Sequence, residues 1–567
     1  MATTPALSAQ QNAAKFSSKS RTIALVIVSI GFIMDLLDST IVNIAIPTIR
    51  VNLHATYSDI QWIIAGYSLA FSVLLITGGR MGDVFGYKKL FIFGVSGFTL
   101  ASLLSGLSQD PQMLIAARIL QGSMAALMVP QVMSLMQVMY KPEERGPING
   151  LFGGLAGIAA TLGPILGGFL IQANIAKLDW RPIFLINVPV GLIGIIAGIK
   201  YLPNGKSPHP LKLDIAGTLL IITALFLLIF PLIEGRELNW PAWTLIMMVA
   251  SIPIFFLFSL WQKKKMEIDG SPLVLPSLMK QFAFRLGLSI NMIFEMSMVG
   301  FFLTFGLFLQ IGLLFSPLHA ALTGIPLAIG ISLTMGILGN KISKIGKNAI
   351  IFGTVIMASG IVAINYTFYH YTTSVHSWQL IPGLLIMGVG MGFIFGSLFG
   401  IVLNGVDASH AGSASGTLNA VQQLGGAIGI ALVGVVFFGQ LSHASSASFN
   451  KVEPAIQKSL TSLSIPAKSQ SFIISGSKQC FVDRSTEKDS SVTPPSCAQT
   501  TSSKTQIGRN ISKTITKQAL QANANNFANA FRWSAIYEVA LLALTLTLTL
   551  FLPKKVAKAS GLPSSIG

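Results

Sequence analysis

The sequence predicts an all-α polytopic membrane protein with about 14 transmembrane helices. Hydrophobic residues make up 52% of its 567 residues and charged residues only 10%, too few charges to cover a soluble domain of this size. The apolar residues fall into runs of about 18–25 residues, the length that crosses a hydrocarbon layer as a helix. Because backbone polar groups cannot be left bare in lipid, and the alternating ten-residue strands typical of a barrel are not seen, helices are the expected elements.

The candidate spans follow the apolar runs along the chain. The first run begins at Thr22 after a polar segment and is too long to be the core of a signal peptide, so we expect it to be retained. The expected spans are 22–46, 60–79, 89–108, 111–137, 148–172, 182–202, 212–233, 242–262, 284–311, 320–339, 349–369, 378–403, 416–440 and 533–552.

Two short loops indicate an internal repeat. Gly79–Lys89 follows the second span and Gly339–Lys347 follows the tenth, and both place two glycines seven residues apart with cations at or after the second. Two related halves around a central site are a common plan of transporters. The predicted domains are an N-terminal tail (1–21), a six-helix half (22–202), two inserted helices with linkers (203–280), five helices of a second half (281–440), a long loop (441–532), a last helix (533–552) and a C-terminal tail (553–567).

Lysine and arginine gather in short loops on one side of the predicted bundle. They stand at positions 88–89, 145, 263–265, 341–347 and 554–558. Because cytoplasmic loops carry such an excess, both termini are expected in the cytoplasm, with the protein in an inner or cytoplasmic cell membrane. This also explains the net charge of +18 better than nucleic-acid binding does.

The long loop 441–532 lies outside the cell in this arrangement. It is rich in Ser, Thr, Lys and Asn, a composition that favours an amphipathic or disordered segment. Both cysteines of the chain, Cys480 and Cys497, lie in this loop. An external disulfide between them is chemically allowed, and free cysteines are the alternative.

Four motifs carry a family resemblance. They are LDSTIVNIAIP at Leu37–Pro47, GRMGDVFGYKK at Gly79–Lys89, RILQG at Arg118–Gly122, and GIAATLGPILGG at Gly157–Gly168. Together they resemble the major facilitator superfamily, and within it the fourteen-span drug:proton antiporters of the EmrB/QacA type. The segment Trp180–Pro189 fits the same branch.

The resemblance implies a fold of two six-helix halves plus two inserted helices. It also implies that the Gly79–Lys89 loop and the fifth span act in gating, through a breakable pair between Asp83 and Lys88 and through a sliding or hinging helix contact; simple static packing is the alternative for the span. Val84 and Tyr87 stand where the family usually has arginines. The gating candidates are Gly79, Asp83, Gly86, Lys88, Gly157, Gly163, Pro164, Gly167 and Gly168.

Asp35 and Asp38 place two carboxyl groups in the first span. Three residues apart, they share one face of the helix at about 5–6 Å. A carboxylate in a low-dielectric span is costly and faces the protein interior or a water-filled path, so we predict that at least one of them couples transport to protons. The alternative is a structural role for Asp38, as a cap or a hydrogen bond to a neighbouring helix.

Arg118 is the other buried charge expected in the first half. Its guanidinium keeps its charge and needs an acidic or polar partner. The family resemblance assigns the matching arginine a role in proton transfer, and a static ion-pair clamp is the alternative. Gln121, one turn away, is expected in the same network and is also a candidate for substrate binding.

Glu295 lies in the middle third of the ninth span. An acid there is suited to meeting a cationic substrate or a second proton. Met292 and Phe294 beside it suit a soft, adaptable substrate pocket. In the alternative arrangement these neighbours face lipid and Glu295 bonds a neighbouring helix.

The expected function is secondary active transport. The sequence has no Gly-x-x-x-x-Gly-Lys-Ser/Thr phosphate loop and its histidines have no metal-ligand spacing, so we expect neither an enzyme nor a bound cofactor. We predict proton-coupled efflux (antiport) of lipophilic or cationic drugs and toxic small molecules by alternating access, with the proton gradient as energy source. A dedicated exporter of one metabolite, such as an antibiotic, an amino acid or a siderophore, and a passive channel or facilitator are the alternatives. The expected partners are the small-molecule substrate, protons and the lipid bilayer, without nucleic acid; an adaptor protein is left open.

Overall fold

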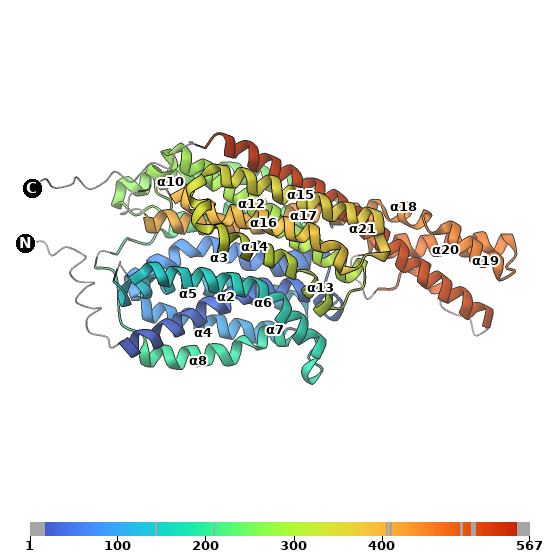
Figure 1. The fold of residues 1–567 in the computed structure, drawn as a ribbon, viewed down its shortest axis with the longest axis horizontal. Helices are drawn as coiled ribbons and strands as arrows, with labels where there is room; N and C mark the ends of the chain where they lie inside the picture. The colour runs from blue at the N-terminus through green and yellow to red at the C-terminus, as the bar shows by residue number, and fades with distance from the viewer. Residues whose placement is uncertain are drawn as a thin grey trace, which may run out of the picture.

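The structure is a computed structural model that describes residues 18–141, 144–208, 210–403, 406, 411–487, 492–500 and 506–552. Within these ranges every regular element is helical, and 14 helices are long and apolar enough to cross a membrane. Most of them run along the long axis of the molecule (Figure 1). The predicted fold class and number of spans are confirmed.

The first half contains six spans. They are α2 (Ser18–Asn52), α3 (Tyr57–Phe85), α4 (Tyr87–Gly106), α5 (Pro111–Met139), α6 (Arg145–Ala173), and α7 (Pro182–Leu185) continued by α8 (Asn187–Tyr201), with the short η2 (Ile175–Lys177) after α6. The inserted pair is α9 (Ile215–Glu234) and α10 (Ala242–Asp269), and α11 (Pro276–Lys280) leads into the second half.

The second half repeats the first. Its spans are α12 (Phe282–Leu307) with η3 (Phe308–Gly312), α13 (Pro317–Thr323) with α14 (Ile325–Ile345), α15 (Lys347–Tyr371) with η4 (Thr372–Ser374), α16 (Ser377–Leu403), α17 (Ala411–His443) and the end of α21 (Gln506–Leu550). Corresponding helices pair alike: α3 packs on α5 and α14 on α16, α2 on α6 and α12 on α17, and α4 on α8 and α15 on α21.

Local signals in the sequence set several helix ends. Thr56 and Asp59 form a capping box at the start of α3, and Asp110 caps α5 in front of Pro111. Gly86 between α3 and α4 has φ +99°, and Gly346 between α14 and α15 has φ +57°. Both backbones lie where a side chain is strained, so a glycine with positive φ stands at the corresponding place of the two repeated loops.

The long segment after α17 is largely helical within the described residues, which fits the amphipathic alternative predicted for it rather than the disordered one. It forms α18 (Ser445–Asn450), α19 (Glu453–Ser462), α20 (Ala467–Thr486) and η5 (Pro495–Thr500), and α21 begins at Gln506 rather than at 533. We call these elements, with residues 506–531 of α21, the extension. Buried Phe449, Ile456 and Leu460 give it a small apolar core. It projects from one end of the bundle (Figure 1), which we call the extension side; the opposite end, where α2 begins and α21 ends, is the chain-end side.

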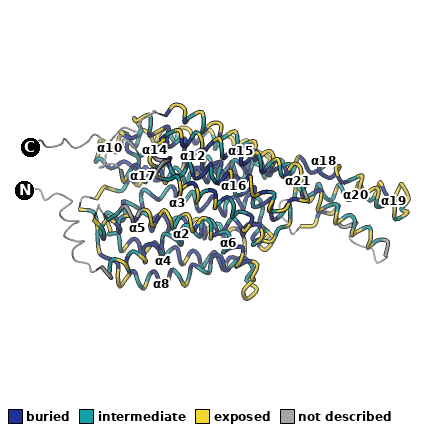
Figure 2. The backbone as a smooth tube through the Cα atoms, in the orientation of Figure 1, coloured by how far each residue is buried: buried dark blue, intermediate teal, exposed yellow. Residues whose placement is uncertain are grey.

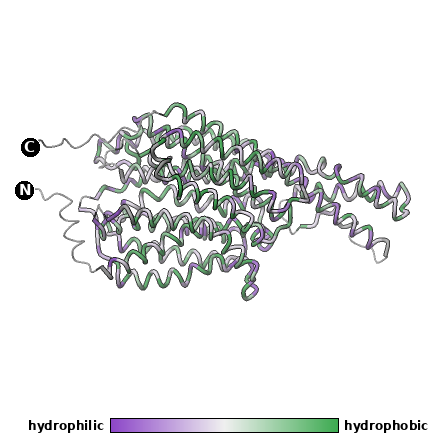
Figure 3. Tube along the Cα trace, in the orientation of Figure 1, coloured by the Kyte–Doolittle hydropathy of each residue, from purple (hydrophilic) through white to green (hydrophobic). Residues whose placement is uncertain are grey.

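The outer surface of the bundle is apolar, as a lipid-facing surface must be. Ile196 on α8 and Ile246 and Ile252 on α10 are 69%, 66% and 67% exposed. The exposed positions line the periphery of the bundle in Figure 2. Hydrophobic colour dominates the bundle in Figure 3, whereas hydrophilic colour increases in the extension.

The two halves meet mainly where α3 packs on α17 and where α6 packs on α13. Gln61 of α3 donates a hydrogen bond from Nε2 to the carbonyl oxygen of Ile430 in α17, at 2.8 Å. On the extension side α6 touches α13 so closely that a Cβ on Gly168 would lie 2.8 Å from Leu318 Cα. On the chain-end side, Cβ atoms on Gly157 of α6 and Gly336 of α14 would meet nothing within 4 Å. The interface of α6 with α13 and α14 is therefore closed at α13, on the extension side, and open at α14, toward the chain-end side.

Candidate functional site

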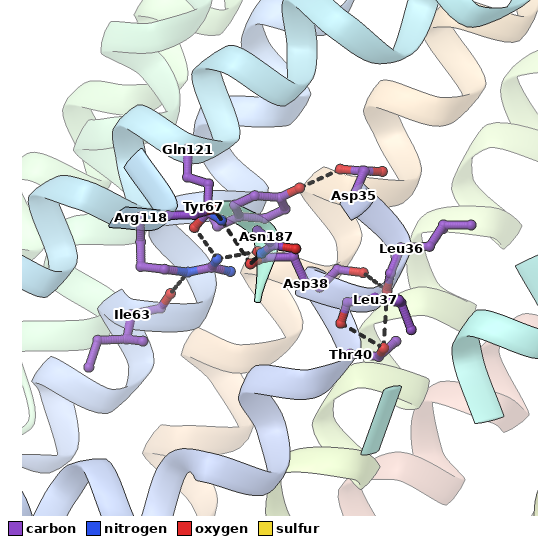
Figure 4. Close-up of polar contacts among 12 residues, drawn as sticks. Asp35, Leu36, Leu37, Asp38, Thr40, Ile63, Tyr67, Arg118, Gln121 and Asn187 are labelled. Atoms are coloured by element: carbon purple, nitrogen blue, oxygen red, sulfur yellow. Dashed lines mark hydrogen bonds and ion pairs between the residues drawn. The ribbon is translucent and has the colours of Figure 1, made fainter. Parts of the chain in front are cut away.

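Asp38 is the centre of a buried polar cluster in the first half (Figure 4). It lies in the middle of α2 and is 1% exposed. Its Oδ2 forms an ion pair with Nη1 of Arg118 from α5. Its Oδ1 accepts hydrogen bonds from Nε2 of Gln121 at 2.7 Å and from Nδ2 of Asn187 at 3.2 Å. The carboxylate thus joins α2, α5 and α8. It is the acidic or polar partner expected for Arg118, and Gln121 lies in the same network, as expected.

Arg118 is enclosed on several sides. Its Nε donates to the carbonyl oxygen of Ile63 at 3.1 Å, and its Nη1 donates to Oε1 of Gln121 at 2.6 Å. The guanidinium carbon lies 4.3 Å from the centre of the Tyr67 ring and 5.7 Å from that of Phe184, within the range of a cation–π interaction. A buried cation with this many partners is positioned by the fold, and losing its counter-charge would be costly.

Tyr67 connects the two carboxyl groups of α2. Its hydroxyl donates a hydrogen bond to Oδ1 of Asp35, while its ring lies next to the guanidinium of Arg118 (Figure 4). Asp35 and Tyr67 are 6% and 2% exposed. Tyr67 and Asn187 were not among the site residues predicted from the sequence. The sequence signal that could have found them is a phenol and an amide within apolar runs, where such groups need a partner.

A largely apolar cavity of about 180 Å³ reaches the Asp38 cluster between α2, α6, α7 and α8. Asp38 and Asn187 are the polar members of its wall. Its remaining lining residues are aliphatic: Ile30, Ile33, Met34, Leu37, Ile41, Leu166, Ile183, Ile186 and Val190. A lipophilic group in this cavity would contact hydrocarbon on most sides and one carboxylate–amide pair on the other.

Glu295 forms a separate polar site in the second half. It is 3% exposed, and its Oε1 accepts a hydrogen bond from Nε2 of Gln422 in α17 at 2.7 Å. Gln422 was not singled out in the sequence. Met292, one turn before Glu295 in α12, packs through its backbone against Gly425 of α17. The predicted substrate candidates are therefore divided, with Gln121 in the first half and Glu295 with Met292 in the second.

Phe294 does not share the surroundings of Glu295. It is fully buried, and its ring meets that of Phe395 in α16 edge to face, with centroids 5.3 Å apart. Consecutive residues of a helix point about 100° apart. The structure therefore places Phe294 in the packed core of the second half rather than beside the carboxyl group.

The predicted pair between Asp83 and Lys88 is not formed. Asp83 Oδ1 instead accepts a hydrogen bond from the Tyr87 hydroxyl at 2.9 Å, and Nζ of Lys88 donates to the Ile199 carbonyl oxygen at 2.8 Å. Tyr87, which replaces a usual arginine of the family, thus bonds to the acid of the loop. Gly86 provides the turn between Asp83 and Tyr87. A Cβ on Gly79 would lie 3.7 Å from Pro130 Cβ, which is an ordinary contact distance.

Arg80 of the same loop has a role that the sequence did not suggest. It is 6% exposed, and its Nη1 donates to the carbonyl oxygens of Ser271 at 2.7 Å and Lys212 at 3.2 Å, while its Nη2 donates to that of Pro272. Lys212 precedes α9, and the other two residues follow α10. Arg80 therefore ties both chain-end connections of the inserted helices to α3.

The predicted gating glycines of α6 divide into two groups. A Cβ on Gly163 would lie 2.0 Å from Thr40 Oγ1, and one on Gly167 would lie 2.7 Å from Ile41 Cγ1. Gly168 touches α13, as described above. Gly157 faces open space, and Pro164 lies within the helix between the two regions. The close contacts thus lie in the part of α6 that packs on α2 and α13.

In the extension, Cys480 of α20 and Cys497 of η5 are joined by a disulfide bond. Cys497 is 4% exposed. Within the described residues, no group of three or more His, Cys, Asp or Glu side chains is placed to hold a metal ion.

Comparisons with known proteins agree with this arrangement. The family model of the Major Facilitator Superfamily matches residues 28–430. The chain belongs to the Major Facilitator Superfamily. Solved structures of superfamily transporters share the fold: a bacterial homologue of the human lysosomal transporter Spinster, in an inward-facing and occupied conformation, has a TM-score of 0.56 at 14% identity over 95% of this chain and 97% of that one.

Relatives within the superfamily are named for antibiotic transport or resistance. The probable actinorhodin transporter of Streptomyces coelicolor is 38% identical over 93% of this chain and 91% of its own length. The tetracenomycin C resistance and export protein of Streptomyces glaucescens is 32% identical over 73% of this chain and 75% of its own. The puromycin resistance protein of Streptomyces alboniger is 30% identical over 73% and 81%.

Proposed function

We propose that this superfamily member is a proton-coupled exporter of lipophilic, antibiotic-like small molecules. The observation that carries the proposal is the apolar cavity whose wall contains the Asp38 carboxylate and the Asn187 amide. A site that is mostly hydrocarbon accepts varied lipophilic compounds, and the Asp38 carboxylate, already paired with Arg118, would favour those with a cationic or donor group when that pair opens. The export activities named for the relatives support the same direction and substrate class.

The proposed coupling step is protonation of Asp38. A proton on this carboxyl cancels the charge that balances Arg118, whose guanidinium is then left buried without its counter-charge, at a cost of about 3–5 kcal/mol. Asp35 lies one turn away and is linked to the Arg118 guanidinium through Tyr67. A shift of Arg118 from one carboxylate toward the other would change how α5 packs on α2, and so connect proton binding to the position of helices in the first half.

The proton gradient is sufficient as the energy source. One charge moved across 100 mV is worth about 2.3 kcal/mol, and a pH step of one unit adds about 1.36 kcal/mol per proton. Together they support a concentration ratio of several hundredfold per proton. In the proposed arrangement both termini are cytoplasmic and the protein lies in the cytoplasmic membrane, because the cation-rich short loops are on the chain-end side.

A dedicated exporter of a single metabolite is the second candidate. One relative favours it: the probable actinorhodin transporter of Streptomyces coelicolor is named for a single compound, and its similarity to the present chain extends over 93% of that chain. Dye uptake into everted vesicles, whose lumen corresponds to the outside of the cell, separates the candidates. Uncoupler-sensitive transport of several unrelated lipophilic dyes supports a broad exporter, whereas transport of actinorhodin without any dye supports a dedicated one.

The matched variants for this assay are Asp38→Asn and Asp110→Asn. Both change one carboxylate to an amide, but Asp110 caps α5 outside the cluster, and asparagine is an equally good cap. We expect loss of gradient-driven efflux in Asp38→Asn alone. Transport that continues at full rate in the presence of an uncoupler would refute proton coupling.

A further inference from the structure

A second cavity, of about 90 Å³, lies where the extension joins the second half. It is formed by the end of α15, the middle of α21 and the link between α18 and α19. Its lining residues are Asn365, Phe368, Tyr369, Thr372, Lys451, Asn525, Ala528, Asn529 and Arg532. None of the residues so far placed in transport belongs to this cavity.

The lining of this second cavity suits an anion. Its charged members are Lys451 and Arg532, three of the others are asparagines, and none of its described lining residues is acidic. The guanidinium carbon of Arg532 lies 5.8 Å from the Tyr369 ring centre, so the aromatic ring helps to hold the cation at the cavity. Ammonium, guanidinium and amide NH₂ groups are all donors, and a phosphate oxygen can accept from each.

Lys451 is held at the cavity by the extension. It follows α18, whose Ser448 donates from Oγ to Oδ1 of Asn526 in α21 at 3.4 Å. Asn526 also donates from Nδ2 to the Leu441 carbonyl oxygen in α17 at 2.9 Å, so α21 holds the chain on both sides of the α17–α18 connection. The cavity therefore has one cation from the extension and one from the start of the last span.

The position of the cavity along the membrane normal identifies the kind of anion. Arg532 precedes Leu550, the last residue of α21, by 18 residues, which is about 27 Å along a helix and close to the thickness of the hydrocarbon layer. Tyr366, Tyr369 and Trp533 are 65%, 71% and 46% exposed at the same level. Exposed tyrosine and tryptophan are typical of the headgroup level, so the cavity opens where lipid phosphates lie.

We propose that this cavity binds the phosphate of an anionic phospholipid in the leaflet on the extension side. The lipid would bridge Lys451 of the extension and Arg532 of the last span, with its acyl chains along the apolar outer surface of α15 and α21. This inference is independent of what the protein transports, because it rests on a different cavity in the other half.

Native mass spectrometry of the purified full chain, titrated with phosphatidylglycerol, tests the site. The double variant Lys451→Gln/Arg532→Gln removes both cations, and Lys458→Gln/Lys468→Gln makes the same charge change at exposed positions elsewhere in the extension. With about 1 kcal/mol for each cation at a membrane surface, phosphatidylglycerol should bind about 30-fold more weakly to the first variant only. An equal loss in both variants would overturn the proposal.

A third variant, Asn529→Leu, separates binding in the cavity from general surface attraction. It fills the cavity without changing charge, so lipid binding should fall about tenfold or more through loss of a hydrogen bond to a charged group. Unchanged binding would mean that the cations act through the surface potential and would refute the cavity as the site. Circular dichroism confirms that each variant is folded.

Two competing ligands identify the source of the phosphate. Phosphatidylcholine should bind the wild type more weakly than phosphatidylglycerol, since it carries no net negative charge, and equal affinity would refute a site for anionic lipid. Inorganic phosphate at the concentration of the lipid should not displace phosphatidylglycerol. Displacement would show a site for the free anion instead of a lipid.

Discussion

Replacing Asp38 by asparagine tests whether the Asp38–Arg118 pair is both a structural link and the proton-coupling element. Asparagine keeps the size of the side chain but turns one acceptor oxygen into a donor. Arg118, Gln121 and Asn187 all donate to this carboxylate, so three donors would compete for one remaining oxygen. The guanidinium, which is 1% exposed, would also lose its counter-charge.

The expected magnitude follows from the burial of both partners. Removing one member of a buried ion pair costs about 3–5 kcal/mol, whereas replacing both by neutral groups of similar volume is often close to neutral. Asp38→Asn and Arg118→Met should therefore each destabilise the protein strongly, and the double variant should be more stable than either single one. The sum of the single effects should exceed the effect of the double by several kcal/mol, which is a large coupling energy.

Unfolding in mixed micelles measures the stability of all three variants, and uncoupler-sensitive efflux in vesicles measures their function. We expect the double variant to recover stability without recovering transport, which separates folding from coupling. If the single effects simply add in the double variant, the two side chains do not interact as described. If Asp38→Asn exports substrate at the wild-type rate under a proton gradient, Asp38 has no role in coupling.

Three further predictions concern other parts of the protein. Gly168→Ala should reduce transport and make a cysteine introduced on the extension side of the bundle more accessible to thiol labelling, because its Cβ has no space. Gly157→Ala should be tolerated, and equal effects of the two variants would refute the closed contact. Cys480→Ser opens a loop with a sequence separation of 17, so hydrogen exchange should show the extension destabilised by about 3 kcal/mol, and an unchanged exchange pattern would contradict this. The Lys141 backbone N–H, with help from Arg21, holds the pKa of Glu144 below its usual value. The ionised Glu144, through both of these contacts, therefore stabilises the protein above about pH 4.3, and this stability is lost as the pH falls through the lowered pKa. The difference in unfolding temperature between the wild type and Glu144→Gln should shrink in that acidic range and not at neutral pH.

The overall architecture was predictable because its determinants are local and repeated. An apolar run long enough for lipid has few alternatives to a helix, so the number of spans follows from composition. The partnership of Arg118 with Asp38 was also within reach, because a charge buried in an oily span must find a counter-charge and few were available. Glycine-rich loops at Gly86 and Gly346 indicated the repeat, and both positions have positive φ.

Other parts of the site depend on packing between helices. Tyr67 and Asn187 are neutral, so no charge in the sequence required them to meet the acids, and their roles became evident only from the placement of α3 and α8 beside α2. Phe294 was grouped with Glu295 by proximity in sequence, although adjacent residues of a helix face different directions. In the Gly79–Lys89 loop, the composition suggested Lys88 as the partner of Asp83, but the turn directs the Tyr87 hydroxyl to it instead.

In the extension, composition alone predicted less order than the structure has. Its polar residues outnumber its apolar ones, which is typical of a disordered segment. Phe449, Ile456 and Leu460 nevertheless meet in one cluster with Ile474 and Ala522, and the Cys480–Cys497 disulfide connects two of its elements. A small helical unit that is cross-linked by a disulfide needs to bury less apolar surface to stay folded than an independent domain does.

Because α21 is one uninterrupted helix, its far end follows any rotation of the second half. Residues 506–531 continue α21 from the last span into the extension without a break in the helix, over about 39 Å. Each degree by which the second half rotates would therefore displace the tip by about 0.7 Å, if the helix turns as a rigid rod. A spin label or fluorophore near Arg509, at the tip of the extension, would report rotation of the second half as a larger and more easily measured displacement of the label.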